Sequence, residues 1–318
     1  MILSLVALLL TFSAQAADVP STHAVIKNDG AIEYYKFLPV HYDPSHSAVV
    51  KNRLSRIDLR SSSLPLQYQI PSKALPPIRD QGQRGTCAYF ATVGILESYY
   101  LNQTNAPASL KISEECLVDV RNWMFDQDKA YTGADKPDQR PDPNGDLPNS
   151  IIKTITKYGV PSEQKYSASL DCTYDGMNQV GGSVSLTDYL STYSGTNASI
   201  PFGKNLAFDE NTAPTVDVIK ALIASNVPVE VGIVVYNEFM NQVDWKYDAS
   251  TDTADNMAGG HAVQLTGYTT QGSKTIFTFK NSWGDTWGNA GYGTLDDGLL
   301  ANSWGYDPTF DFIVSVHN

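Results

Sequence analysis

Residues 81–91 read QGQRGTCAYFA, a glycine-rich turn followed by a mostly apolar run that continues to Tyr100. The run predicts a buried helix that begins at or just after Cys87. A sulfur atom at a helix N-terminus lies beside free backbone amides and the positive end of the helix dipole, which favour an anion. We therefore expect the pKa of the Cys87 thiol to be lowered. Taken alone, the pattern also fits an inert structural cysteine.

A thiolate nucleophile needs a base that takes its proton and later returns it to the leaving group. The chain contains five histidines, and His261 is the only one inside the body of the main domain. It begins an apolar segment, 261–265, that predicts a strand. Because a lone histidine beside a strand is more often structural, a catalytic role for His261 depends on its partners.

The partners that such a histidine needs are present in two other segments. Residues 279–284, FKNSWG, follow a predicted strand. Asn281 can accept the imidazole N–H and fix one tautomer, and Trp283 can shield that bond from water. Gln81 can donate its side-chain amide to a developing oxyanion, together with the Cys87 backbone N–H. The plainer alternatives are an ordinary asparagine turn and a glutamine without a role.

Three motifs together resemble the papain family of cysteine peptidases: QGxxGxC at 81–87, GHA at 260–262 and KNSWGxxWGxxGY at 280–292. The resemblance extends from about Leu64 to near the C-terminus. It implies an α+β, papain-like fold of two lobes, one helical and one an antiparallel β-barrel-like sheet. Cys87 and His261 then face each other across the cleft between the lobes.

The resemblance also assigns roles around this cleft. It makes Cys87 the nucleophile, His261 the base, Asn281 its orienting residue and Gln81 an oxyanion donor. The residues expected to bind substrate are Gly85, Asn144, Gly145, Asp146, Gly260 and Trp283. Asp146 stands where the family often has a second glycine, and its carboxylate is expected to favour basic substrate side chains. No metal ion or other cofactor is implied.

The chain departs from the family pattern at several positions. Ala88 replaces the tryptophan that usually follows the nucleophile. Arg84 and Pro143 occupy both positions of one family disulfide, so that bridge is absent as a pair. Residues 121–142 are longer than the family pattern and are predicted to form an exposed loop near the cleft.

A second family disulfide is expected in an altered form. The family places one of its cysteines at the position of Val120, whereas this chain has Cys116 four residues earlier, on the same face if the segment is helical. The resemblance therefore predicts a bridge between Cys116 and Cys172. Cys87, the remaining cysteine, is then left as a free thiol.

The N-terminal region predicts an exported precursor. Residues 1–16 read MILSLVALLLTFSAQA, an apolar run with a small-residue cleavage site, although no basic residue precedes the run. The alternative of a membrane anchor is disfavoured because the run is too short to span a bilayer. Residues 17–63 are predicted to form a hairpin, a turn and a helix. Their place before the peptidase domain, 64–318, predicts an inhibitory pro-segment that crosses the cleft in a non-productive direction, with a permanent binding module as the alternative.

Composition excludes some functions. The net charge is −12, and residues 64–318 carry 29 acidic and 16 basic residues. Such an acidic body argues against a nucleic-acid partner, which would require basic patches. The acidic loop with Asp248, Asp252 and Asp255 leaves a calcium site open, but a solvated acidic loop is the favoured interpretation.

These observations predict a secreted, monomeric cysteine-type peptidase that is made as a zymogen and hydrolyses peptide bonds through a thioester on Cys87. Two alternatives remain open at this point. One is a papain-fold acyltransferase or deamidase, and the other is an inactive peptide-binding relative, suggested by Ala88.

Overall fold

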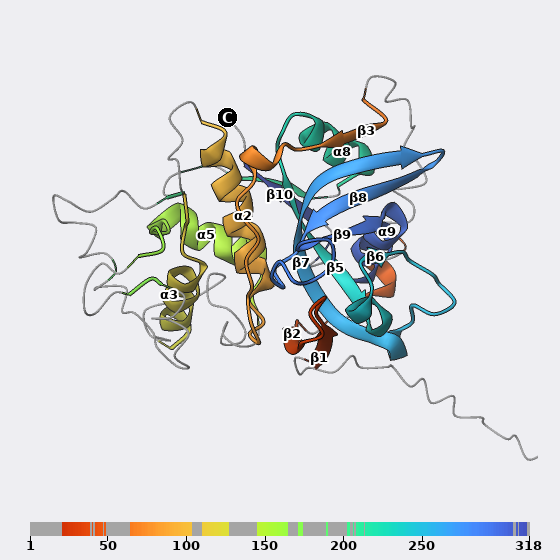
Figure 1. Cartoon of the computed structure of the whole chain (residues 1–318), viewed down its shortest axis with the longest axis horizontal. Helices are drawn as coiled ribbons and strands as arrows, with labels where there is room; N and C mark the ends of the chain where they lie inside the picture. The colour runs from red at the N-terminus through yellow and green to blue at the C-terminus, as the bar shows by residue number, and fades with distance from the viewer. Residues whose placement is uncertain are drawn as a thin grey trace, which may run out of the picture.

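The computed structural model describes residues 21–38, 40, 42–46, 48, 64–103, 110–126, 145–164, 171–173, 189, 202–203, 206, 208–212, 214–307, 310 and 312–316. They form a helical lobe, a sheet lobe and an N-terminal hairpin that lies against the sheet lobe (Figure 1). The expected α+β architecture with two lobes is confirmed. Among these residues, no helix combines the length and the apolar character needed to cross a membrane.

The helical lobe consists of α2 (Cys87–Leu101), α3 (Glu114–Asp126) and α5 (Pro148–Tyr158). Every residue of α2 from Cys87 to Ser98 is buried. This follows from its position, because α2 contacts α3 and α5 on one side and the sheet on the other. Helix α5 has Pro148 in its first turn and is followed by Gly159, whose φ is 72°, at its C-cap.

The sheet lobe has eight strands. Their bounds are β3 (Gln67–Gln69), β4 (Asp209–Thr212), β5 (Val229–Tyr236), β6 (Asp244–Trp245), β7 (Met257–Gln271), β8 (Lys274–Lys280), β9 (Tyr292–Asp296) and β10 (Phe312–Ser315). The order is β4-β10-β5-β7-β8-β9-β6, and β3 pairs with β7. All pairs are antiparallel except β6 with β9. The long strand β7 therefore lies at the centre of the sheet. The sequence predicted that this strand begins at His261, whereas it begins four residues earlier, at Met257.

Further helices cover the sheet lobe. One of them is α8 (Val216–Ala224), with Thr215 as its N-cap. Helix α9 (Asp297–Tyr306), capped by the Asp296 side chain, was not predicted. Short 3-10 turns are η1 (Ser72–Ala74), η2 (Asn237–Asn241) and η3 (Ala254–Asn256).

Two hydrophobic cores meet around α2. The larger core fills the sheet lobe and includes Trp245, Trp283 and Trp304. The second core belongs to the helical lobe, yet it contains Ala262 of β7 as well as Cys87 of α2. The nucleophile therefore lies where the two lobes touch.

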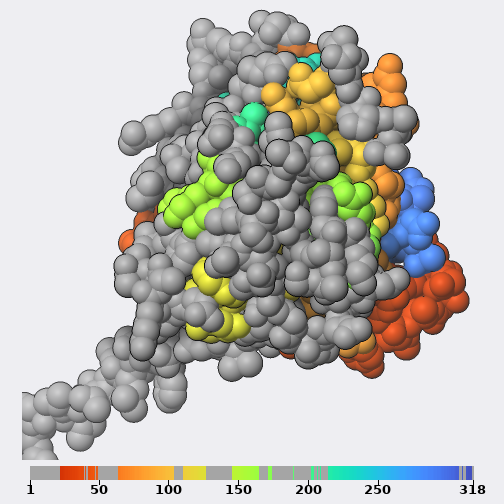
Figure 2. Space-filling model, turned by 90° about the vertical axis from the view of Figure 1, so that its left-hand side faces the viewer, coloured from red at the N-terminus to blue at the C-terminus, as the bar shows by residue number. Residues whose placement is uncertain are grey.

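The N-terminal hairpin is confirmed as β1 (Ser21–Ile26) paired with β2 (Ile32–Phe37). Its side chains Val25, Tyr35 and Phe37 are at most 1% exposed and belong to the core of the sheet lobe. Figure 2 shows the hairpin (red) on the surface beside a blue segment from the C-terminal half. The helix predicted after the hairpin is helical at 44–46 and at 48, and the rest of it, like the predicted signal at 1–16, lies outside the described residues.

Candidate active site

Cys87 is the first residue of α2 and follows the turn that contains Gly82, whose φ is 62°. The thiol is free and buried. It packs in one core with Ala262, and the backbone amides of Ala262 and Ala88 favour the thiolate form of its sulfur. The predicted position at a helix N-terminus is therefore correct, and the sulfur reaches the residue directly after His261.

The predicted lowering of the Cys87 pKa is wrong for this state of the protein. Burial raises the pKa of the thiol to about 11, and the backbone hydrogen bonds that favour the thiolate do not compensate for the lost water. Sequence reasoning considered the helix terminus but not the burial of the thiol between the two lobes. The described state therefore holds a neutral thiol at neutral pH.

His261 lies within β7, four residues after its start, and is only 2% exposed. Its Nε2 atom lies 2.8 Å from Asn281 Oδ1 and donates to that oxygen in the matching tautomer. This tautomer leaves Nδ1 without a proton, as a general base requires. Burial lowers the pKa of His261 to about 4, against the opposing effect of the bond to Asn281. The imidazole is therefore neutral as well.

Asn281 begins the loop after β8, and its Oδ1 atom also accepts from the backbone N–H of Ser282 at 2.9 Å. These two bonds fix the orientation of the side chain. Trp283 is fully buried and stacks on His261 with ring centroids 4.9 Å apart. The indole thus covers the His261–Asn281 bond from one side, as the sequence predicts.

Gln81 is 1% exposed and is held from three sides. Its Oε1 accepts from Ser282 Oγ at 2.5 Å, its Nε2 donates to the Arg84 carbonyl at 2.8 Å, and its backbone N–H donates to the Ser282 carbonyl at 2.8 Å. An amide nitrogen carries two hydrogens, so one donor remains for an oxyanion.

A pocket beside Cys87 and His261 brings together residues from both lobes and the hairpin. Its other lining residues are Leu38, Gly85, Ala88, Gly145, Asp146, Leu147, Pro148, Gly232, Gly260, Ala262 and Phe310. Four of the residues predicted to bind substrate are therefore in place. Trp283 does not line this pocket, and Asn144 lies outside the described residues.

The Asp146 carboxylate is occupied within the protein, which removes the reason to expect selection of basic substrates. Arg121 donates to both of its oxygens, at 2.7 and 3.1 Å, and the Tyr89 hydroxyl donates at 2.7 Å. All three residues are buried. This group connects the pocket wall to α2 and α3. The Asp146 charge is therefore neutralised by Arg121 and has a structural role.

The hairpin continues directly into the site. Leu38 forms a two-way backbone bridge with Gly260, with N–O distances of 3.2 and 2.8 Å. The Phe37 ring stands edge-on to His261, with centroids 5.8 Å apart. A Cβ atom at Gly145 would lie 3.1 Å from Leu38 Cδ1, so that wall of the pocket touches the leucine. The hairpin strand therefore occupies the space between Gly145 and Gly260.

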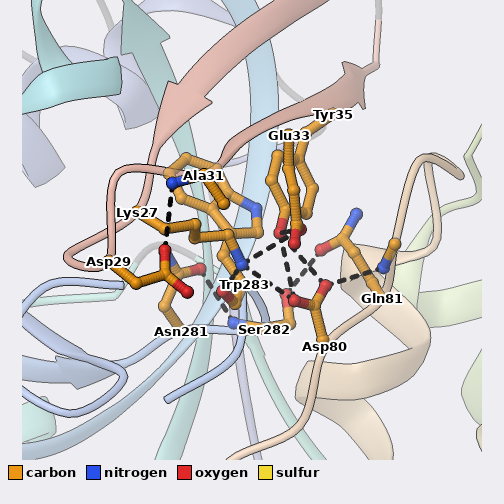
Figure 3. Close-up of polar contacts among 11 residues, drawn as sticks. Lys27, Asp29, Ala31, Glu33, Tyr35, Asp80, Gln81, Asn281, Ser282 and Trp283 are labelled. Carbon is orange, nitrogen blue, oxygen red and sulfur yellow. Dashed lines mark hydrogen bonds and ion pairs between the residues drawn. The ribbon is translucent and has the colours of Figure 1, made fainter. Parts of the chain in front are cut away.

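An ionic clamp, formed by Lys27, Glu33, Tyr35 and Asp80, fastens the hairpin to the catalytic loops (Figure 3). The buried Lys27 ammonium lies 2.9 Å from Asp80 and 3.0 Å from Glu33, and it also donates to the Trp283 carbonyl. The Tyr35 hydroxyl lies 2.6 Å from Glu33 and 3.1 Å from Asp80. Asp80 directly precedes Gln81, and Trp283 follows Asn281 on the other loop. The clamp therefore joins the hairpin to both catalytic loops.

Sequence reasoning did not identify the clamp. Its four members have no local signature, because a lysine before an Asn-Asp-Gly turn and an aspartate before Gln81 are unremarkable in isolation. The clamp forms only when the folded hairpin, which carries Lys27, Glu33 and Tyr35, reaches Asp80 about 50 positions away.

The cysteines follow the prediction made from the resemblance. Cys116 of α3 and Cys172 form a disulfide, with Cα atoms 5.1 Å apart. Within the described parts of the chain, no cluster of three or more potential ligands is arranged for a metal ion. The acidic loop, which was expected to be solvated, contains an internal hydrogen bond: Asp252 Oδ2 accepts from the Asp248 backbone N–H at 2.7 Å.

Comparisons with known proteins agree with this geometry. Residues 64–306 match the family model described as papain family cysteine protease. A cathepsin L-like proteinase of Fasciola hepatica is 26% identical over 251 residues, 74% of this chain and 64% of the relative. Pro-cathepsin H of Medicago truncatula is 29% identical over 223 residues, 70% of this chain and 53% of the relative. The aligned part therefore spans between about half and two thirds of these relatives.

Two solved structures share the fold. Xylellain, a cysteine protease from Xylella fastidiosa, is 19% identical and has a TM-score of 0.56, covering 96% of this chain and 97% of its own. Digestive procathepsin L 3 of Tenebrio molitor larval midgut is 18% identical and has a TM-score of 0.53, covering 87% of this chain and 84% of its own.

Proposed function

Because the chain belongs to the papain family of cysteine proteases, we propose that it is a peptidase that acts through a Cys87 thioester and is made as a zymogen. The observation that carries this proposal is the oriented imidazole beside a free thiol. His261 donates to Asn281 at 2.8 Å beneath Trp283, and it lines one pocket with Cys87. This arrangement supplies a nucleophile, a base and an orienting group.

The proposed reaction proceeds in two halves. His261 Nδ1 takes the thiol proton, and the Cys87 sulfur attacks the carbonyl carbon of the scissile peptide. The resulting oxyanion receives hydrogen bonds from the remaining Gln81 N–H and the Cys87 backbone N–H. The imidazolium then gives its proton to the leaving amine, the C–N bond breaks, and a thioester remains. Water, deprotonated by His261, attacks the thioester and releases the carboxylic acid and the thiol.

The hairpin is proposed to inhibit this reaction within the same molecule. Leu38 takes the backbone positions of Gly260 that an extended peptide would use, and the cover withdraws water from the catalytic pair. With the pKa of Cys87 raised to about 11 and that of His261 lowered to about 4, the pair rests in its neutral forms. Both charged forms regain water when the hairpin leaves.

Two further expectations are kept as proposals. Residues 1–16 are proposed to direct export, after which the precursor comprises a pro-segment at 17–63 and a peptidase domain at 64–318. The substrates are proposed to be peptides or proteins bound by a monomeric enzyme, without a nucleic-acid partner.

The decisive experiment combines covalent labelling with a cleavage assay. A peptide-like epoxide that alkylates active thiols is expected to label the protein, and Cys87→Ala to abolish the labelling. Cleavage of a dipeptidyl reporter is expected to rise when residues 17–63 are removed by limited proteolysis. Labelling without any cleavage would contradict a peptidase. Equal cleavage before and after removal would contradict inhibition by the hairpin.

A further inference from the structure

Glu230 is a carboxyl group buried between the two lobes, outside the catalytic groups described so far. It belongs to β5, a strand without an exposed residue, and is itself 1% exposed. Its two oxygens lie 3.0 and 2.9 Å from the hydroxyl of Thr92, which belongs to α2 and is fully buried. Thr92 is five positions after Cys87 on the same helix.

The described residues that pair with or contact Glu230 are uncharged, and the cation in the same row of the sheet, Lys280, lies one strand beyond Gln264. On the sheet, its neighbours in register are Gln264 of β7 and Val314 of β10, which are neutral. On α2, the group that faces it is the Thr92 hydroxyl. A carboxylate with only one hydroxyl partner in such a place is poorly solvated and tends to take up a proton.

Gln264 adds an independent indication of a missing donor in this interface. Its Nε2 donates to Ser98 Oγ of α2 at 3.1 Å, which directs the side chain toward the helix. Its Oε1 is buried and has no hydrogen-bond donor among the described residues. Gln264 is paired in register with Glu230 on one side and with Lys280 on the other, and its Oε1 faces Gly94 of α2. A protonated Glu230 carboxyl group is the donor that the β5 side can supply.

We propose that Glu230 is a positioning residue of the catalytic pair, which as a neutral acid holds α2 against the sheet and on losing its proton opposes the Cys87 thiolate. Burial is consistent with this, because it raises the pKa of Glu230 to about 8 against the lowering effect of the Thr92 hydrogen bond. The negative charge of Glu230 also raises the pKa of Cys87, the titratable group on α2 that responds to it. The proposal rests on the proposed function only in taking Cys87 as the nucleophile.

The test uses the full chain and a small thiol reagent, iodoacetamide, so that it requires no peptidase activity. The labelling rate of Cys87 is measured for the parent and for Glu230→Gln from about pH 6 to about pH 9.5, a range that brackets the value of about 8. The glutamine keeps the shape but carries no charge at any pH. We expect the ratio of variant to parent rates to rise by roughly tenfold across this range, as one poorly screened charge would cause.

Two further variants keep the proposal falsifiable if Glu230→Gln does not fold. Thr92→Val removes the hydrogen bond that favours the ionised Glu230 carboxylate. The pH above which Glu230 slows the labelling of Cys87 is therefore expected to be higher in this variant than in the parent. Thr92→Ser retains the hydroxyl, and its ratio to the parent is expected to stay flat. An infrared band of a protonated carboxylic acid, lost in Glu230→Gln, is expected at neutral pH.

A flat ratio for both Glu230→Gln and Thr92→Val would overturn the proposal. Absence of the infrared band would do the same, because Glu230 would then be ionised at neutral pH. A protein that labels at Cys87 but never cleaves a peptide would contradict the proposed function alone, and the ratio would still test Glu230.

Discussion

The first prediction concerns Phe37, the hairpin residue that lies against the catalytic histidine. It is 1% exposed, and its ring lies 5.8 Å from that of His261 and 5.9 Å from that of Trp283. Phe37→Ala is expected to weaken docking of the hairpin, because it removes the aromatic contact that seals the site. The matched control is Tyr34→Ala on the same strand, where the side chain is 50% exposed.

The magnitude follows from these contacts. Truncation of a buried phenylalanine costs about 3–5 kcal/mol. Part of that cost is felt inside the hairpin, where Phe37 also contacts His23 at 5.5 Å, so about 3 kcal/mol is assigned to docking. This corresponds to an increase of roughly 150-fold in the population of undocked hairpin.

The assay is the second-order rate of alkylation of Cys87 by an epoxide thiol inhibitor in the full chain at neutral pH. We expect Phe37→Ala to react about 100-fold faster than the parent, as the population estimate implies, and Tyr34→Ala to react within about twofold of it. Equal rates for Phe37→Ala and Tyr34→Ala, in proteins with native circular dichroism, would refute the claim that the hairpin limits access.

Three further predictions concern buried charge. Lys27→Met is expected to speed alkylation of Cys87 by about tenfold, because it leaves the carboxylates of Asp80 and Glu33, 34% and 41% exposed, without their cation. An unchanged rate would argue against the clamp. Burial raises the pKa of Glu33, but hydrogen bonds from Tyr35 and Lys27 outweigh burial, so the pKa is lowered in the docked state. The contribution of Glu33 to docking is therefore fully present above the ordinary value of 4.5 and is lost as the pH falls through the lowered value. Tryptophan fluorescence should report that loss in the parent, and a smaller response in Glu33→Gln. Asp146→Asn is expected to destabilise the fold by about 3 kcal/mol, because it leaves the Arg121 charge buried and unpaired; urea unfolding measures this, and a loss below about 1 kcal/mol would count against a structural role.

Much of the site could be predicted from sequence because its parts are coded locally. The turn before Cys87 and the apolar run after it specify a buried helix with a sulfur at its start. The block around Asn281 places an amide and an indole on one loop, and the structure brings both to His261. The hairpin was predictable for the same reason, since Asn28-Asp29-Gly30 separates two β-rich runs.

The remaining features depend on contacts between distant segments. The pKa of Cys87 could not be predicted from its helix terminus, because the thiol is buried where the helical lobe meets Ala262 of the distant strand β7. Asp146 reads as a free carboxylate until Arg121 is found beside it. Glu230 reads as one polar residue in a strand, and only its contact with Thr92 across the lobe boundary reveals its burial.

The way the hairpin is fastened has a consequence for how the enzyme would mature. Its bridge at Gly260 and its ammonium clamp at Asp80 are non-covalent, so cutting the chain between residues 63 and 64 breaks neither of them. Such a cut instead replaces a tethered ligand, present at an effective concentration of the order of millimolar, by a free peptide that can diffuse away. We therefore expect a nicked sample to remain silent when concentrated and to gain activity on dilution.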